Sequence, residues 1–195
     1  MLTYYQEITL LPEEEIPVSF LMSKVFLQLH LGIASQMTDV DTSKIGISFP
    51  QYRNEADGWD LGTKIRVFAS SEEELRQLNL KRLLHRYQDY VHCIKPRKIP
   101  ERQIHGYAIY SRYHQESSIA QKARRYAKRH GGSETDAAEL FSATDWREMP
   151  TLKLTSLSNQ HTYWICVDKR EVESDTEEHQ FNSFGLSNLS AVPEF

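Results

Sequence analysis

The chain has 195 residues, of which 39% are hydrophobic and 26% charged, an ordinary composition for a globular protein. This length is enough to bury a real core, so neither disulfides nor a metal is needed for stability. Cys93 and Cys166 form no Cys-x-x-Cys unit, which predicts reduced thiols and no zinc site. The chain opens on no secretory signal, and the apolar stretch 25–34 is too short to span a bilayer. We therefore expect a cytoplasmic protein that uses no cofactor and no metal.

The first half of the chain predicts the order strand, helix, strand, strand, helix, strand. We expect the strands at residues 4–10, 45–49, 64–68 and 91–94, with a polar loop between the second and the third. The first helix is expected from 17 to about 37, with Ser19 as its N-cap. The second helix, expected from 72 to 89 with a break, follows the capping-box pair Ser71 and Glu74. This order is the ferredoxin-like (RRM-like) arrangement, but the strands lack the aromatic signature of RNA-recognition motifs.

Pro96 and Pro100 mark a junction, which divides the chain into predicted domains of residues 1–96 and 97–195. The second half predicts a mixed α+β domain with an arginine-rich helix. We expect its elements at 103–114 (extended), 118–130 (helix), 133–143 (short helix), 151–158 with 161–172 (hairpin) and 181–195 (a final strand with an irregular end). The overall class is therefore α+β.

Charge is distributed unevenly along the chain. The net charge is −4, yet ten Lys and Arg and only two acids lie between Lys95 and His130, which gives this segment +8 and the remainder −12. One concentrated basic patch can bind a polyanion, while the acidic remainder keeps the protein soluble.

The helix within this basic segment carries its cations on one face. We expect Ser117 and Ser118 to cap it and Gly131-Gly132 to end it after His130. The cations are Lys122, Arg124, Arg125, Lys128 and Arg129. The opposite side, expected to dock on the protein, consists of Ile119, Ala120, Ala123, Tyr126 and Ala127. A solvated basic face is the alternative, but the helix offers these cations no acidic partner four residues away, which favours phosphate binding.

Three further residues are candidates for chemistry. His30 lies in a nearly apolar helical stretch, so it is either a hydrogen-bonded core histidine or a proton carrier of metal-free RNA cleavage. Ser156 and Ser158 are two residues apart and share one face of a strand, where serines are usually structural. No Gly-x-Ser-x-Gly elbow is present, so the three do not form a serine-hydrolase triad.

Several segments of the chain have a distinctive order and spacing. The segments are Phe20 to His30, Ile45 to Pro50, Leu61 to Arg66, Ser111-Arg112, the helix ending Arg129-His130, Leu152 to Ser158, Gly185-Leu186-Ser187 and Val192 to Phe195. Together they resemble the type I-F CRISPR repeat endoribonucleases. The match covers nearly the whole chain and is weakest at 76–100.

The resemblance implies a metal-independent reaction in which a ribose 2′-hydroxyl of the RNA is the nucleophile. His30 matches the histidine that assists removal of the proton from a ribose 2′-hydroxyl, and Ser156, with Ser158 close by, matches the serine that holds this ribose. The products are a 2′,3′-cyclic phosphate and a 5′-hydroxyl. Tyr163 matches the aromatic residue that stacks beneath the terminal base pair of the hairpin stem.

The resemblance also assigns RNA contacts. Arg112 matches the arginine that reads a guanine edge in the major groove. The basic helix matches through Arg124, Arg125, Lys128, Arg129 and His130. Two positions depart from the family pattern. Phe184 stands where a tyrosine often orients the histidine, and His114 stands where a glutamine accompanies the guanine-reading arginine, which bears on base preference.

The sequence therefore predicts an endoribonuclease that cleaves CRISPR repeat RNA at the base of a hairpin. We expect it to retain the mature guide RNA as a subunit of a type I-F surveillance complex. The alternative is an inactive hairpin-binding subunit of the same complex. A duplex-DNA binder is disfavoured, because neither a helix-turn-helix nor a zinc signature is present.

Overall fold

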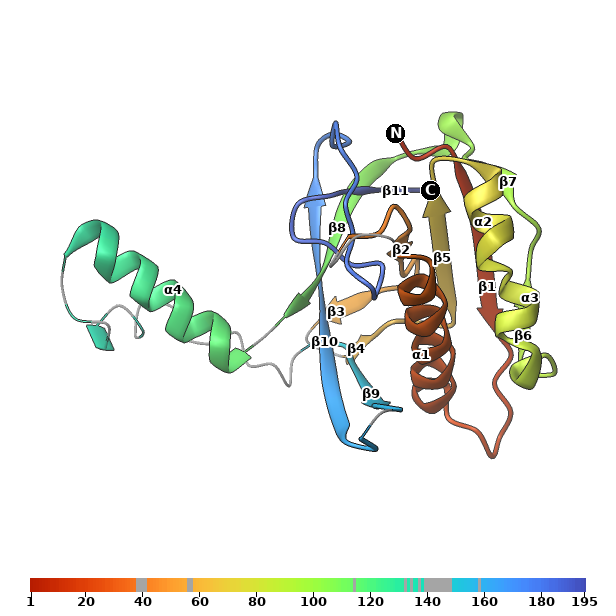
Figure 1. Ribbon diagram of the computed structural model, residues 1–195, viewed down its shortest axis with the longest axis horizontal. Helices are drawn as coiled ribbons and strands as arrows, with labels where there is room; N and C mark the ends of the chain where they lie inside the picture. The colour runs from red at the N-terminus through yellow and green to blue at the C-terminus, as the bar shows by residue number, and fades with distance from the viewer. Residues whose placement is uncertain are drawn as a thin grey trace.

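The structure is a computed structural model that describes residues 1–37, 42–55, 58–113, 115–131, 133, 135–136, 138, 149–157 and 159–195. Within these residues it consists of two antiparallel sheets, a short hairpin and several helices (Figure 1). The α+β class predicted from the sequence is therefore confirmed.

The first sheet is formed by the N-terminal half of the chain. Within the described residues it has five strands, in the order β2-β5-β1-β6 with β7 also paired to β1. They are β1 (Tyr4–Leu10), β2 (Gly46–Ser48), β5 (Lys64–Ala69), β6 (Val91–Cys93) and β7 (Arg97–Lys98). Ile8 of β1 pairs with Ile65 on one side and with Cys93 on the other, and it is fully buried. The four strands expected in this half are confirmed.

Helix α1 (Val18–Gln36) packs its apolar residues into the core, and its buried side chains include Phe26, Leu29 and Ile33. The helix begins directly behind Pro17, which occupies the N-cap without a side-chain hydrogen bond. The expectation that Ser19 caps it is wrong, because proline already fixes the backbone angle that starts the helix and Ser19 falls in the first turn. By length and composition α1 could cross a membrane, a test that the core helix of a soluble protein also passes, and 44% of this stretch is buried inside the protein.

The expected polar loop contains a hairpin that the sequence analysis missed. Strands β3 (Arg53–Glu55) and β4 (Gly58–Asp60) pair with each other, and an ion pair joins Arg53 to Asp60. Three-residue strands made mostly of polar side chains show no hydrophobic alternation, so the pattern gave no signal.

The second predicted helix occurs in pieces, as expected. Helix α2 (Glu72–Leu78) opens with a capping box between Ser71 and Glu74. Asn79 interrupts it with a left-handed backbone (φ 46°) and caps α3 (Leu80–Leu83), which the 3₁₀ turn η1 (His85–Tyr87) follows.

The second sheet comes from the C-terminal half and has four strands within the described residues, in the order β11-β8-β10-β9. They are β8 (Gly106–Tyr113), β9 (Thr151–Thr155), β10 (Thr162–Val172) and β11 (Val192–Glu194), and the turn η2 (Glu101–Gln103) precedes them. The expected extended stretch and hairpin are confirmed. Both sheets contribute to one core, in which Phe26 and Ile65 belong to the same cluster as Leu154 and Val167.

Helix α4 (Gln115–His130) extends away from both sheets (Figure 1). It begins before Ser117 and Ser118, so their expected capping role is wrong; Gln115 and Glu116 are good helix formers and extend the helix backward. It ends at His130, and Gly131 has the left-handed backbone (φ 70°) expected of a helix stop.

The expected docking face of α4 is only partly buried. Ala123 is 2% exposed, whereas Tyr126 is 38% exposed and Ala120 is also exposed. A face of three alanines, one isoleucine and one tyrosine offers little apolar area to bury against a sheet. The expected helix 133–143 and Gly132 lie largely outside the described residues.

The two cysteines are free, as expected. Burial raises the pKa of the Cys93 thiol to about 11, so this thiol stays protonated at neutral pH.

Candidate functional site

His30 is held by a loop distant in sequence. Its Nδ1 lies 3.0 Å from the backbone oxygen of Ser183. A carbonyl oxygen only accepts hydrogen bonds, so Nδ1 must carry the proton. In the neutral ring Nε2 then bears the lone pair, which is the state required of a proton acceptor.

The ring of Phe184 covers the imidazole. The two rings are stacked with centroids 4.0 Å apart and an interplanar angle of 11°. Phe184 also stacks on Phe26 of α1 at 6.1 Å, and the guanidinium of Arg112 lies 5.4 Å from its ring centroid. His30, Phe184 and Arg112 therefore form one cluster, which connects α1, β8 and the loop after β10.

The surroundings of His30 disfavour its charged form. Burial lowers the pKa of His30 below its ordinary 6.5, and the positive charge of Arg112 lowers it further. The Ser183 carbonyl acts in the opposite direction, because it stabilises a protonated ring, but the net pKa shift is downward. At neutral pH the imidazole is therefore uncharged and can take up a proton.

Arg112 is half-buried on β8, where it pairs with Val167 of β10. Burial lowers its pKa, although nearby Tyr163 and Cys166 raise it. A guanidinium nevertheless stays charged at any ordinary pH. Its buried Nε has no hydrogen-bond partner among the described residues. The half-buried guanidinium keeps its positive charge and can therefore attract an anion supplied by a ligand.

Ser156 follows β9, the strand that lies beside α1. The backbone N–H of Lys153 donates to Ser23 Oγ of α1 at 3.2 Å, which joins the two elements. Ser156 N donates to the His161 carbonyl at 2.9 Å, so Ser156 is fixed at the end of the β9–β10 hairpin. Tyr163 is half-buried on β10 and packs against the core. Ser158 and His114 lie outside the described residues.

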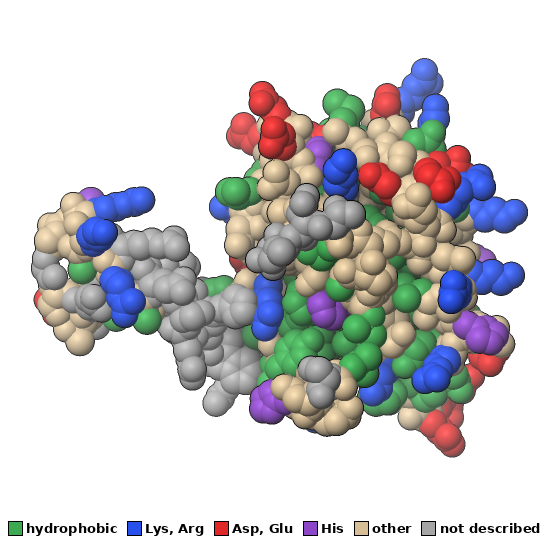
Figure 2. Space-filling view, viewed as in Figure 1, with side chains coloured by type: hydrophobic (Ala, Val, Ile, Leu, Met, Phe, Trp, Pro, Cys, Tyr) green, Lys and Arg blue, Asp and Glu red, His purple; other side chains and the backbone are tan. Residues whose placement is uncertain are grey.

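The basic helix presents its charges to solvent. Arg124, Lys128, Arg129 and His130 are exposed, and Figure 2 shows blue side chains gathered on α4, apart from the body of the protein. The side chains of Lys122 and Arg125 lie outside the described part of the structure. The structure thus holds the predicted phosphate-binding residues on a different element from His30.

Two further residues, Trp164 and Asn182, were not among the candidates predicted from the sequence. Trp164 is 56% exposed on β10, and the ammonium of its cross-strand partner Lys153 lies 5.5 Å from its ring centroid. Alternation along β10 could have indicated it, since Trp164 lies between the inward-facing Tyr163 and Ile165. Asn182 begins a turn with Gly185 at its fourth position, a common turn signature.

No cluster of three or more metal-binding side chains occurs among the described residues. A cavity of about 980 Å³ lies between the start of α1, the β3–β4 hairpin and the start of β9, where Met22, Trp59 and Thr151 line it. Neither His30 nor Arg112 lines this cavity. The His30 cluster is thus separate from this cavity.

The whole chain matches a known family. Residues 5–195 match the model of the CRISPR-associated protein family Cas_Csy4, and the chain belongs to this family. A CRISPR-associated endonuclease Cas6/Csy4 from Pseudomonas aeruginosa (strain UCBPP-PA14) is 29% identical over 198 residues, which cover 98% of this chain and 99% of that protein. An endonuclease of the same description from Escherichia coli (strain UTI89 / UPEC) is 28% identical over 196 residues, with the same coverage. The resemblance found in the sequence is therefore confirmed.

Proposed function

We propose that this protein is an endoribonuclease that cleaves CRISPR repeat RNA at the base of a hairpin. Its family and its relatives' description as endonucleases support cleavage of a nucleic acid. The observation that carries the proposal is the pairing of His30 Nδ1 with the Ser183 carbonyl, which leaves Nε2 as the proton acceptor. The exposed cations of α4 supply the attraction for a polyanion.

In the proposed reaction the RNA provides its own nucleophile. His30 Nε2 takes the proton of a ribose 2′-hydroxyl, and this oxygen forms a bond to the adjacent phosphorus while the bond to the 5′-oxygen breaks. The 2′,3′-cyclic phosphate remains on one fragment. The 5′-oxygen takes a proton from water and leaves as a hydroxyl, and protonated His30 returns its proton to the solvent. Ser156 and Ser158 hold the attacking ribose. Since the nucleophile is a hydroxyl of the substrate, the step needs a base and not a metal-bound water.

RNA recognition is divided between two groups of residues in this proposal. Arg112 reads a guanine edge near the base of the stem, with His114 as its neighbour, and Tyr163 stacks beneath the lowest base pair. The basic helix contacts phosphates through Lys122, Arg124, Arg125, Lys128, Arg129 and His130. Phosphate contacts to the stem survive cleavage, which supports retention of the guide RNA within a type I-F surveillance complex.

We also infer the finer architecture. The antiparallel order β2-β5-β1-β6, with α1 and α2 in the connections, supports a ferredoxin-like domain of residues 1–96. Residues 97–195 then form the RNA-hairpin-binding domain. Such a protein works in the cytoplasm, where the guide RNA is made.

An inactive hairpin-binding subunit is the second candidate. Phe184 favours it, because a phenyl ring stacks on His30 but offers no hydroxyl to orient it. Under this alternative the wild-type protein binds the hairpin without cutting it, and Phe184→Tyr restores cleavage. Under the main proposal the wild-type protein cleaves, because Ser183 orients the ring instead.

The test uses purified protein with a hairpin repeat RNA in excess EDTA. We expect cleavage there, and none when the nucleotide 5′ of the break carries a 2′-deoxyribose. A requirement for magnesium, or cleavage of the deoxy substrate, would contradict the proposed mechanism.

A further inference from the structure

The loop after β10 brings Ser183 and Phe184 to His30, although Ser183 is 153 residues away in the chain. Residues 173–191, all of which the structure describes, form no helix and no strand beyond one isolated bridge at Phe181. The position of the Ser183 carbonyl is therefore set not by a regular helix or sheet but by individual side-chain and backbone hydrogen bonds of this loop.

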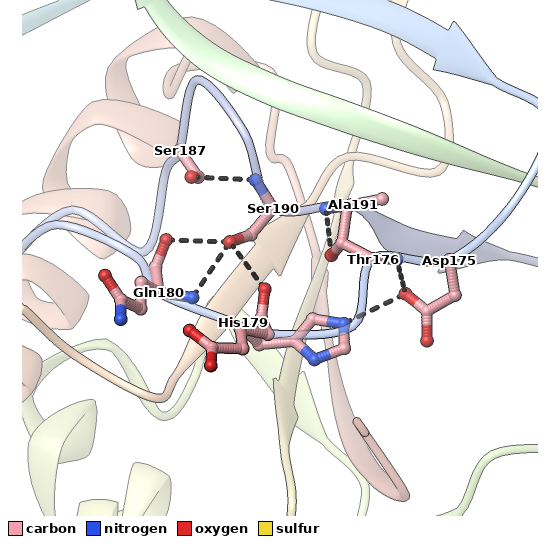
Figure 3. A network of polar contacts seen from close by, with 8 residues as sticks. Asp175, Thr176, His179, Gln180, Ser187, Ser190 and Ala191 are labelled. Carbon is pink, nitrogen blue, oxygen red and sulfur yellow. Dashed lines mark hydrogen bonds and ion pairs between the residues drawn. The ribbon is translucent and has the colours of Figure 1, made fainter.

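The two ends of the loop are tied together by a polar network (Figure 3). Ser190 Oγ accepts the backbone N–H of Gln180 at 2.8 Å and lies 3.0 Å from the Gln180 carbonyl. Ala191 N donates to Thr176 Oγ1 at 3.2 Å, and His179 Nε2 pairs with Asp175 at 2.9 Å. These contacts fix where the loop begins and ends, but none of them touches the turn that faces His30.

Asn182 organises that turn. Its Oδ1 accepts the backbone N–H of Phe184 at 2.8 Å and that of Leu186 at 3.2 Å. Its backbone carbonyl accepts Gly185 N at 2.9 Å, and its own N–H donates to the Leu186 carbonyl at 2.8 Å. Ser183 lies inside this set of bonds, so the direction of its carbonyl is set by them.

The turn is also fixed to the first sheet. Ile47 N of β2 donates to the Gly185 carbonyl at 2.8 Å. Gly185 has a left-handed backbone (φ +70°), and a Cβ there would lie 2.6 Å from Ile47 Cγ1, so only glycine fits. The turn consequently has a rigid support on one side and His30 on the other.

We propose that Asn182 is a positioning residue for the candidate base. By holding the 182–186 turn, it keeps the Ser183 carbonyl on His30 Nδ1 and thereby keeps Nε2 as the acceptor. Among the described residues the Ser183 carbonyl is the one hydrogen-bond partner of His30, and Phe184 only stacks on the imidazole. The proposal rests on the function proposed above.

Two substitutions test it. Asn182→Ala removes the acceptor of both N–H bonds, so the carbonyl is no longer fixed. Asn182→Asp keeps an acceptor of the same shape and adds a negative charge near His30, which raises the pKa of the imidazole. Gln51→Ala is the matched control, because the side-chain amide oxygen of Gln51 also accepts a backbone N–H (Thr63 N, 2.8 Å) but lies outside the site.

The measurements are RNA affinity and the pH dependence of the single-turnover cleavage rate. Asn182→Ala is expected to cleave about tenfold more slowly or worse with unchanged affinity, the pattern of a lost orienting group. Asn182→Asp is expected to recover most of the rate at high pH, with the rising limb of its pH profile moved upward. A wild-type rate in Asn182→Ala, a loss no greater than in Gln51→Ala, or an unmoved pH profile in Asn182→Asp overturns the proposal.

A readout independent of cleavage separates this proposal from the proposed function. The ¹⁵N shifts of the His30 ring report its tautomer: we expect the Nδ1–H form in the wild-type protein and a mixture in Asn182→Ala. If the wild-type protein never cuts RNA but the tautomer responds in this way, the proposed function fails and the positioning role stands. If the tautomer is unchanged in Asn182→Ala, the positioning role fails whatever the cleavage result.

Discussion

His30 and the cations of α4 are held by the protein in opposite ways. The imidazole is half-buried, stacked on Phe184 and bonded to a backbone carbonyl. Arg124, Lys128 and Arg129, the described cations of α4, are exposed on a helix that leaves the body of the protein (Figure 1). Proton transfer requires atoms within hydrogen-bond reach, whereas attraction between charges extends over about 10 Å at ordinary salt. The buried cluster is therefore expected to govern rate, and the exposed helix to govern affinity.

The largest expected effect is on the rate. His30→Ala should reduce single-turnover cleavage by about 10²-fold or more, the usual scale for removal of a general base. RNA affinity should barely change, because a neutral imidazole adds little to phosphate binding. His92→Ala, on the exposed face of β6, is the control and should cleave normally. Normal cleavage by His30→Ala would show that His30 is a hydrogen-bonded core histidine and not the base.

Arg112 lies on the boundary between the two regions, since it is half-buried beside Phe184 and yet is proposed to contact RNA. Arg112→Ala should weaken binding by about 1–3 kcal/mol and abolish the preference at one base pair. Affinities for the natural stem and for a stem with its lowest pair inverted measure this preference. If Arg112→Ala weakens binding to both stems equally, Arg112 contacts a phosphate and does not read a base.

Single substitutions on α4 should have smaller and more uniform effects. Arg124→Ala, Lys128→Ala or Arg129→Ala should weaken binding to all stem sequences alike and make the salt slope shallower by about one unit. Lys81→Ala, an exposed lysine of α3, serves as the control. A change in sequence preference, or a lower cleavage rate once the RNA is bound, would contradict the expectation that α4 governs affinity and the His30 cluster governs rate.

The smallest effect concerns pH. Because burial and Arg112 lower the pKa of His30, the base is already neutral at pH 7. The rate should rise with pH through a midpoint below 6.5 and change little above it. Single-turnover rates between pH 5 and 8 give this midpoint. A midpoint above 7 would mean that the imidazole is charged at neutral pH and that its surroundings in the RNA complex differ from those described.

Local sequence patterns were reliable wherever an element follows from its own residues. The strand Tyr4–Leu10 and the capping box of Ser71 and Glu74 have the expected bounds and partners. The helix stop at Gly131 is of the same kind, because glycine alone adopts that backbone cheaply. Patterns failed at Ser19, because Pro17 occupies the N-cap position instead. They also failed at the β3–β4 hairpin, because its short polar strands show no hydrophobic alternation.

The sequence by itself determined which residues are candidates: a histidine in an apolar helix, an arginine-rich helix and the spacing shared with a family. The tertiary structure alone decided their environment. It placed Ser183 against His30 across 153 positions of sequence, stacked Phe184 on the imidazole, and placed the guanidinium of Arg112 over the Phe184 ring. The physical reason is that periodicity and capping are local, whereas the tautomer and the pKa of an imidazole depend on groups that only the folded chain brings within a few ångströms.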